Sequence, residues 1–377
     1  MEAAPTICAT VACNLDAHIL AATYPLLEAG QVEALEWSFD ALYAHEQVPA
    51  WFTNLLHAYG EAGRLVGHGV FFSLLSGRWS AEQQQWLGQL RRAATKFRFD
   101  HVTEHFGFFT GQNFHHGAPL PVPYSARALR IGQDRLRRLA DAARCPVGLE
   151  NLAFAYSLDE VQRHGEFLDE LLRPVNGFLI LDLHNLYCQL HNFAVPYDEL
   201  IARYPLDRVR EIHISGGSWD DSPLLPTRRI RRDTHDEAVP EEVFELLVQT
   251  LPRCPRLKYV VLEQLGSGLA TAESQARFRH DFQRMRTLVE QHRAGRPAHQ
   301  PGAFQPPAAG PSGPAAEDAG LHEQQRQLAR ILETAPSYAA AWQQLQASPL
   351  ACSDWQIEHW EPHMLETARN IARKWKQ

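Results

Sequence analysis

The sequence of 377 residues predicts an α/β fold, a closed (β/α)8 barrel of the TIM type followed by a small α-helical module. Three observations support this prediction. Eight short apolar segments alternate with segments of helical pattern, which is typical of parallel βα units. The last six of these segments end in or near histidine or carboxylate residues, and TIM barrels keep their chemistry at the carboxyl ends of the strands. Beyond residue 294, Pro, Ala and Gly dominate the composition.

The predicted strands are short and the helices between them are of ordinary length. Residues 178–181 (FLIL) form an uninterrupted apolar run, the composition of a strand buried on both faces. We expect strands at 6–14, 32–39, 65–70, 101–104, 146–149, 178–181, 209–214 and 259–262. We expect helices at 16–28, 49–62, 80–97, 125–144, 157–172, 197–203, 240–251 and 272–294. The long connection at 107–124 is rich in Phe, Gly and Pro, which favours a lid or a substrate wall.

Three parts of the chain are distinguished by composition. Residues 1–294 form the barrel, and residues 295–319 form a flexible linker without core-forming residues. Residues 320–377 regain helical character and carry Trp342, Trp355, Trp360 and Trp375. Aromatic residues at helical spacing more often form the core of a small module than a binding site.

Composition also excludes several classes of protein. A hydrophobic content of 45% and a charged content of 21% are ordinary for a soluble globular protein. The formal net charge of −8 argues against a general nucleic-acid binder, whose phosphate contacts require a basic surface. The N-terminal segment lacks a basic region typical of a secretory signal, and no apolar run is long enough to span a membrane. The six cysteines are scattered without a CxxC pair, which indicates reduced thiols in a cytoplasmic protein.

Histidine is unusually frequent, with 19 residues, and some of the histidines follow a pattern. An isolated histidine is more often structural than a ligand. The third to eighth predicted strands, however, end in or near His68, Glu104 and His105, Glu150, Asp182, His213 and Glu263, and His235 lies in the loop after the seventh strand. A carboxylate at the end of an apolar strand is costly to desolvate unless it is paired or bound to a metal. A salt bridge with an arginine at the barrel mouth is the alternative for Glu150 and Glu263.

The types of donor atom among these candidates narrow the choice of metal ion. Imidazole mixed with carboxylate, without cysteine, suits non-haem iron, manganese or zinc. The candidates exceed what one ion can use, which indicates two or more metals bridged by carboxylates. Glu104, Asn151 and Asp236 are placed to hold the ligating histidines by hydrogen bonds. A loop with Arg228, Arg229, Arg231 and Arg232 is either a solvated surface or a dock for an acidic peptide.

Over approximately residues 6–293 the sequence resembles the multinuclear non-haem iron-dependent oxidative enzymes (MNIO). The motifs that carry the resemblance are HGV at His68, TEHFG at Glu104, LPVPYS before Ser125, GLEN at Glu150, LDLHNLY at Asp182, EIHISGG at His213, DTHDEAV at Asp233 and VLEQ at Glu263. The resemblance implies a barrel related to sugar isomerases and endonucleases. It also implies two or three iron ions as mixed Fe(II)/Fe(III), O2 as co-substrate, and oxidation of a ribosomally made precursor peptide, often at cysteine. A partner protein or domain delivers the leader of that peptide.

Carried over motif by motif, the resemblance implies nine metal ligands: His68, His105, Glu150, Asp182, Asn185, His213, Asp233, His235 and Glu263. Phe106, Phe108, Phe109 and Tyr124 are expected to wall the peptide channel. The sequence departs from the family pattern at His184, where an asparagine is common, and we expect His184 to be an extra ligand or to support one. Further departures are His191, which precedes Asn192, and Gly217-Ser218, which stand where a histidine often follows.

Two other functions remain open at this point. One is a zinc- or manganese-dependent hydrolase or isomerase of a sugar or phosphodiester on the same type of barrel. The other is a peptide-binding scaffold with a degenerate site. Metal content and O2 dependence separate the first alternative from the oxidase. The C-terminal module is expected to recognise the leader peptide, mediate dimerisation or contact a partner, so that removing the residues after Ala294 leaves metal binding intact while weakening peptide modification.

Overall fold

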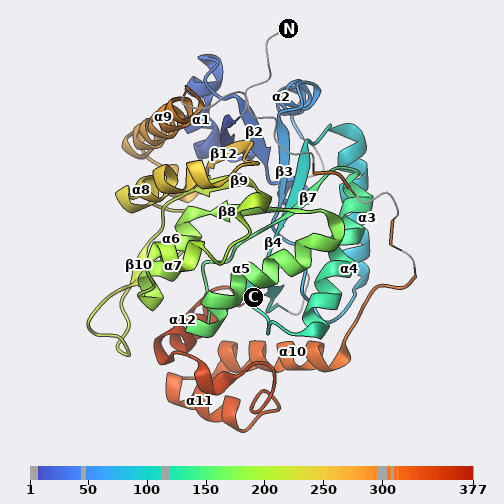
Figure 1. Cartoon of the computed structure of the whole chain (residues 1–377), viewed down its shortest axis with the longest axis vertical. Coiled ribbons are helices and arrows are strands. Elements are labelled where there is room, and N and C mark those ends of the chain that lie inside the picture. The colour runs from blue at the N-terminus through green and yellow to red at the C-terminus, as the bar shows by residue number, and fades with distance from the viewer. Residues whose placement is uncertain are drawn as a thin grey trace.

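Eight parallel strands close into a barrel in the order β1-β12-β9-β8-β7-β4-β3-β2 (Figure 1). The computed structural model of the chain describes residues 7–43, 48–111, 117, 119–294, 304–306, 310–311 and 313–376. The barrel strands are β1 (Cys8–Ala12), β2 (Ala34–Trp37), β3 (Leu65–Gly69), β4 (His101–His105), β7 (Val147–Glu150), β8 (Phe178–Asp182), β9 (Val209–Ile214) and β12 (Tyr259–Leu262). Each coincides with a predicted strand, so the predicted barrel is confirmed.

Helices cover the outside of the barrel between successive strands. They are α1 (Ala17–Glu28), α2 (Ala50–Glu61), α3 (Ala81–Lys96), α4 (Ala126–Ala143), α5 (Leu158–Leu172), α6 (Leu183–Phe193), α7 (Tyr197–Ile201), α8 (Glu241–Thr250) and α9 (Ala272–Ala294). Local sequence explains where some of these helices begin. At the start of α3, for example, Ser80 and Gln83 form a reciprocal capping box. Helix α6 was not predicted. It begins directly after β8, where the Asp182 carboxylate accepts a bond of 2.6 Å from the backbone N–H of Asn185.

The long connection after β4 contains a short antiparallel ribbon. Strand β5 (Phe108–Phe109) pairs with β6 (Pro119–Leu120), so that Phe109 lies opposite Pro119. Residues 112–116 and 118 of this connection lie outside the described part of the chain. A second ribbon, β10 (Trp219–Asp220) with β11 (Ile230–Arg231), lies in the loop after β9. Both ribbons follow the carboxyl ends of barrel strands, on the face where barrel enzymes bind their substrates.

The barrel interior has an apolar layer and a polar layer. Cys8, Ala34, Val66, Tyr259 and Val261 form a buried cluster separate from the main core between strands and helices. Two residues further along each strand, on the same face, the sequence places polar side chains such as Glu36, His68 and Glu263. Period-two alternation therefore stacks a charged layer above the apolar one.

The C-terminal helices lie across the carboxyl face of the barrel. They are α10 (Ala319–Thr334), α11 (Tyr338–Gln346) and α12 (Pro362–Lys374), grouped at one end of the molecule in Figure 1. The ring of Trp360 stacks on that of Tyr156 after β7, with centroids 3.8 Å apart and planes at 8°. Trp355 packs on Phe108, and Gln325 bonds to backbone atoms of Leu75 and Gly77 after β3. The module and the barrel share one hydrophobic core.

The described residues of the predicted linker contact the barrel. Phe304 is 4% exposed and packs on Phe178, with the guanidinium groups of Arg210 and Arg256 over its ring. Nearer the module, the Ala316 N–H donates to an Asp134 carboxylate oxygen over 3.1 Å. The domain boundaries at 294, 319 and 377 stay predictions.

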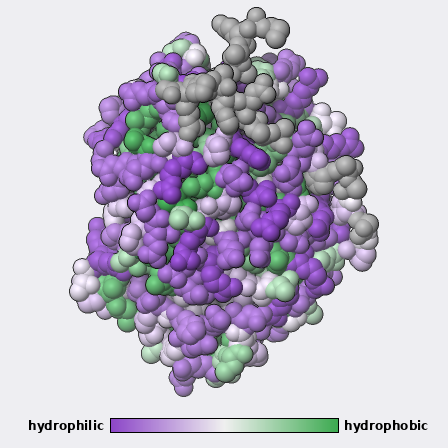
Figure 2. All heavy atoms as spheres, viewed as in Figure 1, coloured by the Kyte–Doolittle hydropathy of each residue, from purple (hydrophilic) through white to green (hydrophobic). Residues whose placement is uncertain are grey.

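The surface carries few large apolar side chains. Figure 2 shows a mainly hydrophilic face on which apolar groups are small and scattered. Tyr24, Trp51, Val248 and Trp375 are among the exposed large hydrophobic residues, and they lie on different helices or helix ends. No helix among the described residues has the length and apolar character needed to cross a membrane.

We predict that Trp360→Ala lowers the free energy of unfolding by about 3–5 kcal/mol, because it removes a buried ring from the contact between module and barrel. Urea unfolding monitored by circular dichroism measures this difference. Trp375→Ala, at a position 51% exposed, is the matched control and should change stability by no more than about 0.5 kcal/mol. Equal effects of the two substitutions would contradict a shared core.

Candidate metal centre

The polar ends of the barrel strands converge into one cluster. Four groups of three side chains each bring potential ligand atoms within 4.8 Å of one another. The groups are His68–His105–Glu150, Glu150–Asp182–His213, Asp182–His235–Glu263 and Glu36–His213–Glu263. Neighbouring groups share a residue, so the four form one continuous site. Seven of the nine predicted ligands belong to these groups, and their role as ligands stays a prediction.

The first group joins β3, β4 and β7. The Nε2 atoms of His68 and His105 are 2.9 Å apart, and both face the Glu150 carboxylate at 3.5 and 3.1 Å. The opposite nitrogen of His68, Nδ1, lies 2.9 Å from the hydroxyl of Thr103, which itself donates to the Gly67 carbonyl. Nδ1 of His68 must therefore carry the proton, and the lone pair of Nε2 points into the cluster. That is the tautomer a ligating imidazole requires.

His213, at the centre of the cluster, is held by a chain of buried bonds. Arg210 donates to Nδ1 of His101, so Nε2 of His101 carries its proton and donates to Glu211 over 2.6 Å. The other Glu211 oxygen lies 3.2 Å from Nε2 of His213, and Glu36 lies 3.1 Å from the same nitrogen. Nδ1 of His213 consequently faces Glu263 and Glu150, at 3.3 and 3.8 Å.

Asp182 and Asn185 are fixed by the start of α6. One Asp182 oxygen caps the helix, while the other has no hydrogen-bond partner among the described residues. The side chain of Asn151 bonds both to the backbone N–H and to the carbonyl of Asp182, at 2.7 and 3.1 Å. Asn151 was expected to support the ligating histidines; it instead holds the backbone of a predicted carboxylate ligand.

The loop after β9 contributes the remaining candidates. Nε2 of His235 lies 2.7 Å from Asp233, and Nδ1 lies 3.4 Å from Glu263. His235 has a φ of +52°, in the left-handed region of backbone conformation. For a residue other than glycine this conformation costs on the order of 1 kcal/mol or more, and it often marks functional positions. Arg231 donates to Nε2 of His184, so His184 must donate from Nδ1 to Asp233, over 3.2 Å. His184 therefore orients a predicted ligand.

The charges of the cluster are mutually dependent. Burial opposes the charge of His105, but the hydrogen bond that His105 donates to the Glu150 carboxylate, together with that carboxylate's charge, outweighs burial and raises the pKa of His105 to about 9. Burial likewise opposes ionisation of Glu150, yet the histidines, led by His105, lower its pKa. Burial and the charge of His105 lower the pKa of His68 to about 4. Burial raises the pKa of Glu36 to about 8. Without metal, protons bound to the cluster thus compensate the negative charge of its carboxylates. A bound metal cation would compensate that charge instead.

The donor atoms fit such a cation. Asp182 Oδ2 and Asn185 Oδ1 are buried and lack a hydrogen-bond partner among the described residues, and His213 Nδ1 and Glu263 Oε2 lie 3.3 Å apart without hydrogen-bond geometry. Buried polar atoms are almost always satisfied, so several unsatisfied atoms in one place call for an explanation. Nitrogen and carboxylate donors at this density are the ligands that non-haem iron, manganese and zinc accept.

A cavity of about 460 Å³ opens beside the cluster. Asp233 and His235 line it, together with Arg231 and Arg232. Leu152 and Phe154 from the barrel and Met364, Ile371 and Trp375 from the C-terminal module supply apolar walls. The volume is within the range of ordinary ligand sites.

The four predicted wall residues do not line this cavity. Phe106 is buried against Tyr124, His164 and Phe167, and Phe108 packs on the module. The Leu152 N–H donates to Nε2 of His164, so His164 donates from Nδ1 to the Tyr124 hydroxyl over 2.7 Å. Phe109 lines a different cavity, next to α10.

Other predicted neighbours also lie outside the cluster. Glu104 is buried beside Asp40, and burial together with that carboxylate raises the pKa of Glu104 well above its usual range. Asp236 is exposed and accepts a bond from Thr234. His191 points to the Arg229 carbonyl in the β10–β11 region. The four arginines of this loop are bonded within the chain, to Asn192, Asp221, His184 and Asp220 in sequence order.

Sequence reasoning missed Glu36 and Glu211. Glu36 is 2% exposed and pairs with His213. Strand periodicity carried the missing signal, because Glu36 shares a face with Ala34 and Glu211 shares one with His213. A polar residue two positions from an inward-facing residue of a barrel strand also faces inward.

Comparison with known proteins identifies relatives. The model of a family described as RiPP precursor modification enzyme MbnB/TglH/ChrH matches residues 41–267. A UPF0276 protein of Chromobacterium violaceum is 30% identical over 224 residues, which cover 59% of this chain and 78% of that protein. A UPF0276 protein of Caulobacter vibrioides is 29% identical over 195 residues, 51% of this chain and 66% of that protein. A xylose isomerase domain protein from Planctomyces limnophilus superposes with a TM-score of 0.50 at 16% identity, covering 75% of this chain and 97% of that chain, which shows the fold alone.

The buried His164 predicts a specific loss of stability in acid. Burial lowers its pKa to about 3 from the ordinary 6.5. Below pH 6.5 this histidine binds a proton in the unfolded chain but stays neutral in the folded chain, so unfolding becomes more favourable as the pH falls. Between pH 6.5 and pH 5.0 this group should cost about 2 kcal/mol. Urea unfolding at both pH values measures the free energy of unfolding. Its decrease from pH 6.5 to pH 5.0 should be smaller in His164→Gln than in the wild type by that amount. The same pH dependence in both proteins would contradict the assignment.

Proposed function

Because the chain belongs to the RiPP precursor modification enzyme family MbnB/TglH/ChrH, we propose that it is an iron-dependent oxidase of a ribosomally synthesised precursor peptide. In this proposal the enzyme consumes O2, holds two or three iron ions and acts on a cysteine of the peptide. A leader-binding partner protein completes the system. The nine predicted ligands hold the metal, with Glu36 as an additional carboxylate at its edge.

The observation that carries the proposal is the sharing of carboxylates between ligand groups. Glu150, Asp182 and Glu263 each belong to two of the four groups. A carboxylate with two oxygens in neighbouring groups is suited to bridging two cations. A mononuclear site needs only three or four protein ligands, and a cluster of this size supplies donors for more than one ion.

Residues around the cluster determine how it would hold metal. Thr103 fixes the tautomer of His68, Glu211 accepts the Nε2 proton of His213, and His184 orients Asp233. Such outer bonds typically affect metal affinity by about 10–100-fold. Bound iron would supply the activation of O2 and the oxidising power. The chain supplies orientation of the donors and a largely buried site that limits access of water.

The cavity next to His235 is the proposed place of the peptide. Its apolar walls fit a side chain near the modified residue, and Ile371 from α12 is one of them. Arg232 and Lys374 line the same cavity and favour an acidic group nearby. The C-terminal module would therefore contact the substrate directly, in addition to stabilising the barrel.

The competing function is a zinc- or manganese-dependent hydrolase or isomerase. The mixed histidine and carboxylate donors are compatible with those metals as well. Such an enzyme would act without O2 and would need one or two ions. O2 consumption that depends on the peptide separates the two functions.

Substrate oxidation tests the proposal directly. Iron-reconstituted protein should consume O2 only in the presence of the precursor peptide encoded beside its gene, and mass spectrometry should show the mass change on a cysteine-containing fragment. Ile371→Asp should raise the KM for the peptide by roughly tenfold, since it places a charge in the apolar wall, with iron content unchanged. Val248→Asp, at a position 52% exposed on α8, is the control and should behave as wild type. Peptide binding without O2 consumption would contradict the oxidase function.

A further inference from the structure

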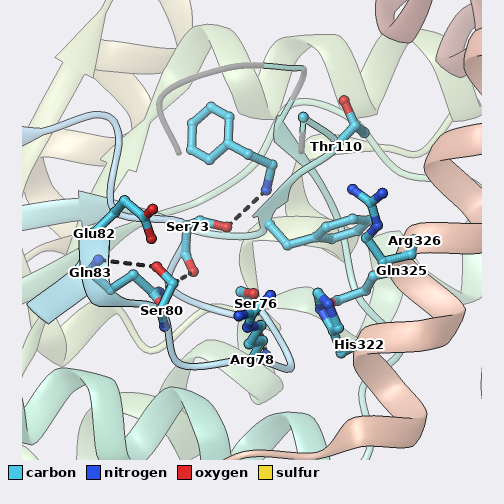
Figure 3. Close-up of a pocket in the computed structure, with 13 residues that line it drawn as sticks. Ser73, Ser76, Arg78, Ser80, Glu82, Gln83, Thr110, His322, Gln325 and Arg326 are labelled. Carbon is cyan, nitrogen blue, oxygen red and sulfur yellow. Dashed lines mark hydrogen bonds between the residues drawn. The ribbon is translucent and has the colours of Figure 1, made fainter. Parts of the chain in front are cut away.

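A second cavity, of about 360 Å³, lies between the loop after β3, the β5–β6 ribbon and α10 (Figure 3). Its lining is mainly polar, with Ser73, Ser76 and Ser80 from the loop and from the start of α3. Phe109 provides an aromatic wall, and its backbone N–H donates to Ser73 over 3.0 Å. None of these residues belongs to the candidate metal centre.

Three basic side chains meet in this cavity. Arg78 comes from the barrel loop, and His322 and Arg326 come from successive turns of α10. Among the described residues, no ion pair is formed by the guanidinium of Arg78 or of Arg326. Figure 3 shows Arg78, His322 and Arg326 on one side of the cavity, whereas Glu82 lies on the other side beside Ser80 and Gln83. No carboxylate pairs directly with this basic side among the described residues, although Glu82, Glu317 and Glu323 lie near enough for their charges to act on it.

This concentration of positive charge disfavours a further cation. Burial and then the charges of Arg78 and Arg326 lower the pKa of His322, against smaller opposing effects of Glu323 and Glu317. An anion placed between the two guanidiniums would relieve their repulsion and would also be met by serine hydroxyls. Paired guanidinium and hydroxyl donors are the usual partners of carboxylate and phosphate groups.

The cavity adjoins the proposed peptide site through a single ribbon. Phe109 on β5 lines the basic cavity, and its partner Pro119 on β6 lines the cavity beside His235. Neighbouring strands are only ~4.8 Å apart. A peptide that leaves the first cavity over this ribbon reaches the second within a few residues.

We propose that the basic cavity between the β3–α3 loop and α10 binds the carboxylate of an acidic residue in the precursor peptide. The geometry that carries the proposal is the meeting of Arg78, His322 and Arg326 in a formed cavity next to the substrate path. The identity of the peptide as the source of the carboxylate rests on the proposed function. The site would set the register of the peptide relative to the residue held beside His235.

Isothermal titration calorimetry on the full-length chain tests this proposal without measuring oxidation. The probes are an acetylated, amidated tetraglutamate peptide and inorganic phosphate. Tetraglutamate should bind the wild type, and Arg78→Gln and Arg326→Gln should each weaken binding roughly tenfold. Arg330→Gln, an exposed arginine one turn further along α10, is the matched control and should leave the Kd unchanged.

Proton uptake gives a second readout. Titrations at pH 6.5 in two buffers of different ionisation enthalpy should reveal proton uptake with tetraglutamate, because a bound carboxylate favours charged His322, and His322→Gln should abolish it. Equal affinity for phosphate would overturn the peptide as the source, and absence of binding, or binding unaffected by the arginine substitutions, would overturn the site. Each of these results leaves metal content and O2 consumption untouched, so the proposed function would stand or fall separately.

Discussion

The desolvation of carboxylates in the barrel mouth is the constraint on which the rest of the structure depends. Glu36, Glu150, Asp182 and Glu211 are each at most 4% exposed, and Glu263 borders them. A buried carboxylate without compensation is costly by several kcal/mol. Without metal, protonated histidines provide the compensation, and the pKa of His105 rises to about 9 as a consequence. A cluster of cations would satisfy the same oxygens and leave the histidines free as ligands.

The fold meets this constraint through the geometry of its strands. Parallel strands of similar length place corresponding residues at the same height in the barrel, so one polar residue per strand forms a ring. Beneath that ring, Glu211 links His101 to His213 and extends the polar network toward the apolar bottom layer. The left-handed backbone of His235 shows that the loop after β9 is held in an unfavourable conformation at the site. Stability is reduced locally where binding is expected.

The sequence was informative wherever the signal was local. Buried strands and the polar residues at their ends, such as Glu150 and His213, follow from apolar runs that stop at a charged residue. Glu36 is harder to find because it lies within its strand, where only the face that it shares with Ala34 reveals that it points inward. Helix α6 was missed because the apolar residues of β8 continue into it, with Asp182 serving as both strand end and helix cap. Ile371 lines the cavity beside His235 only because α12 docks on the barrel, and local sequence patterns do not encode such docking.

Docking of the C-terminal helices links stability to the proposed activity. The stack of Trp360 on Tyr156 fixes α12 over the barrel, and α12 in turn closes one side of the cavity beside His235. Helix α10 forms the basic cavity on the other side of the β5–β6 ribbon. The module thus shapes both places where a peptide would be held, although none of its residues belongs to the ligand groups.

Metal analysis of freshly purified protein under anaerobic conditions, paired with Mössbauer spectroscopy, shows whether the barrel holds a carboxylate-bridged iron cluster. We expect two or more iron ions per chain in the wild type and in Glu245→Gln, which changes an exposed carboxylate on α8. We expect Glu150→Gln to lose iron, because the Glu150 carboxylate belongs to two ligand groups. A single zinc or manganese ion per chain, or full iron content in Glu150→Gln, would contradict a carboxylate-bridged iron cluster.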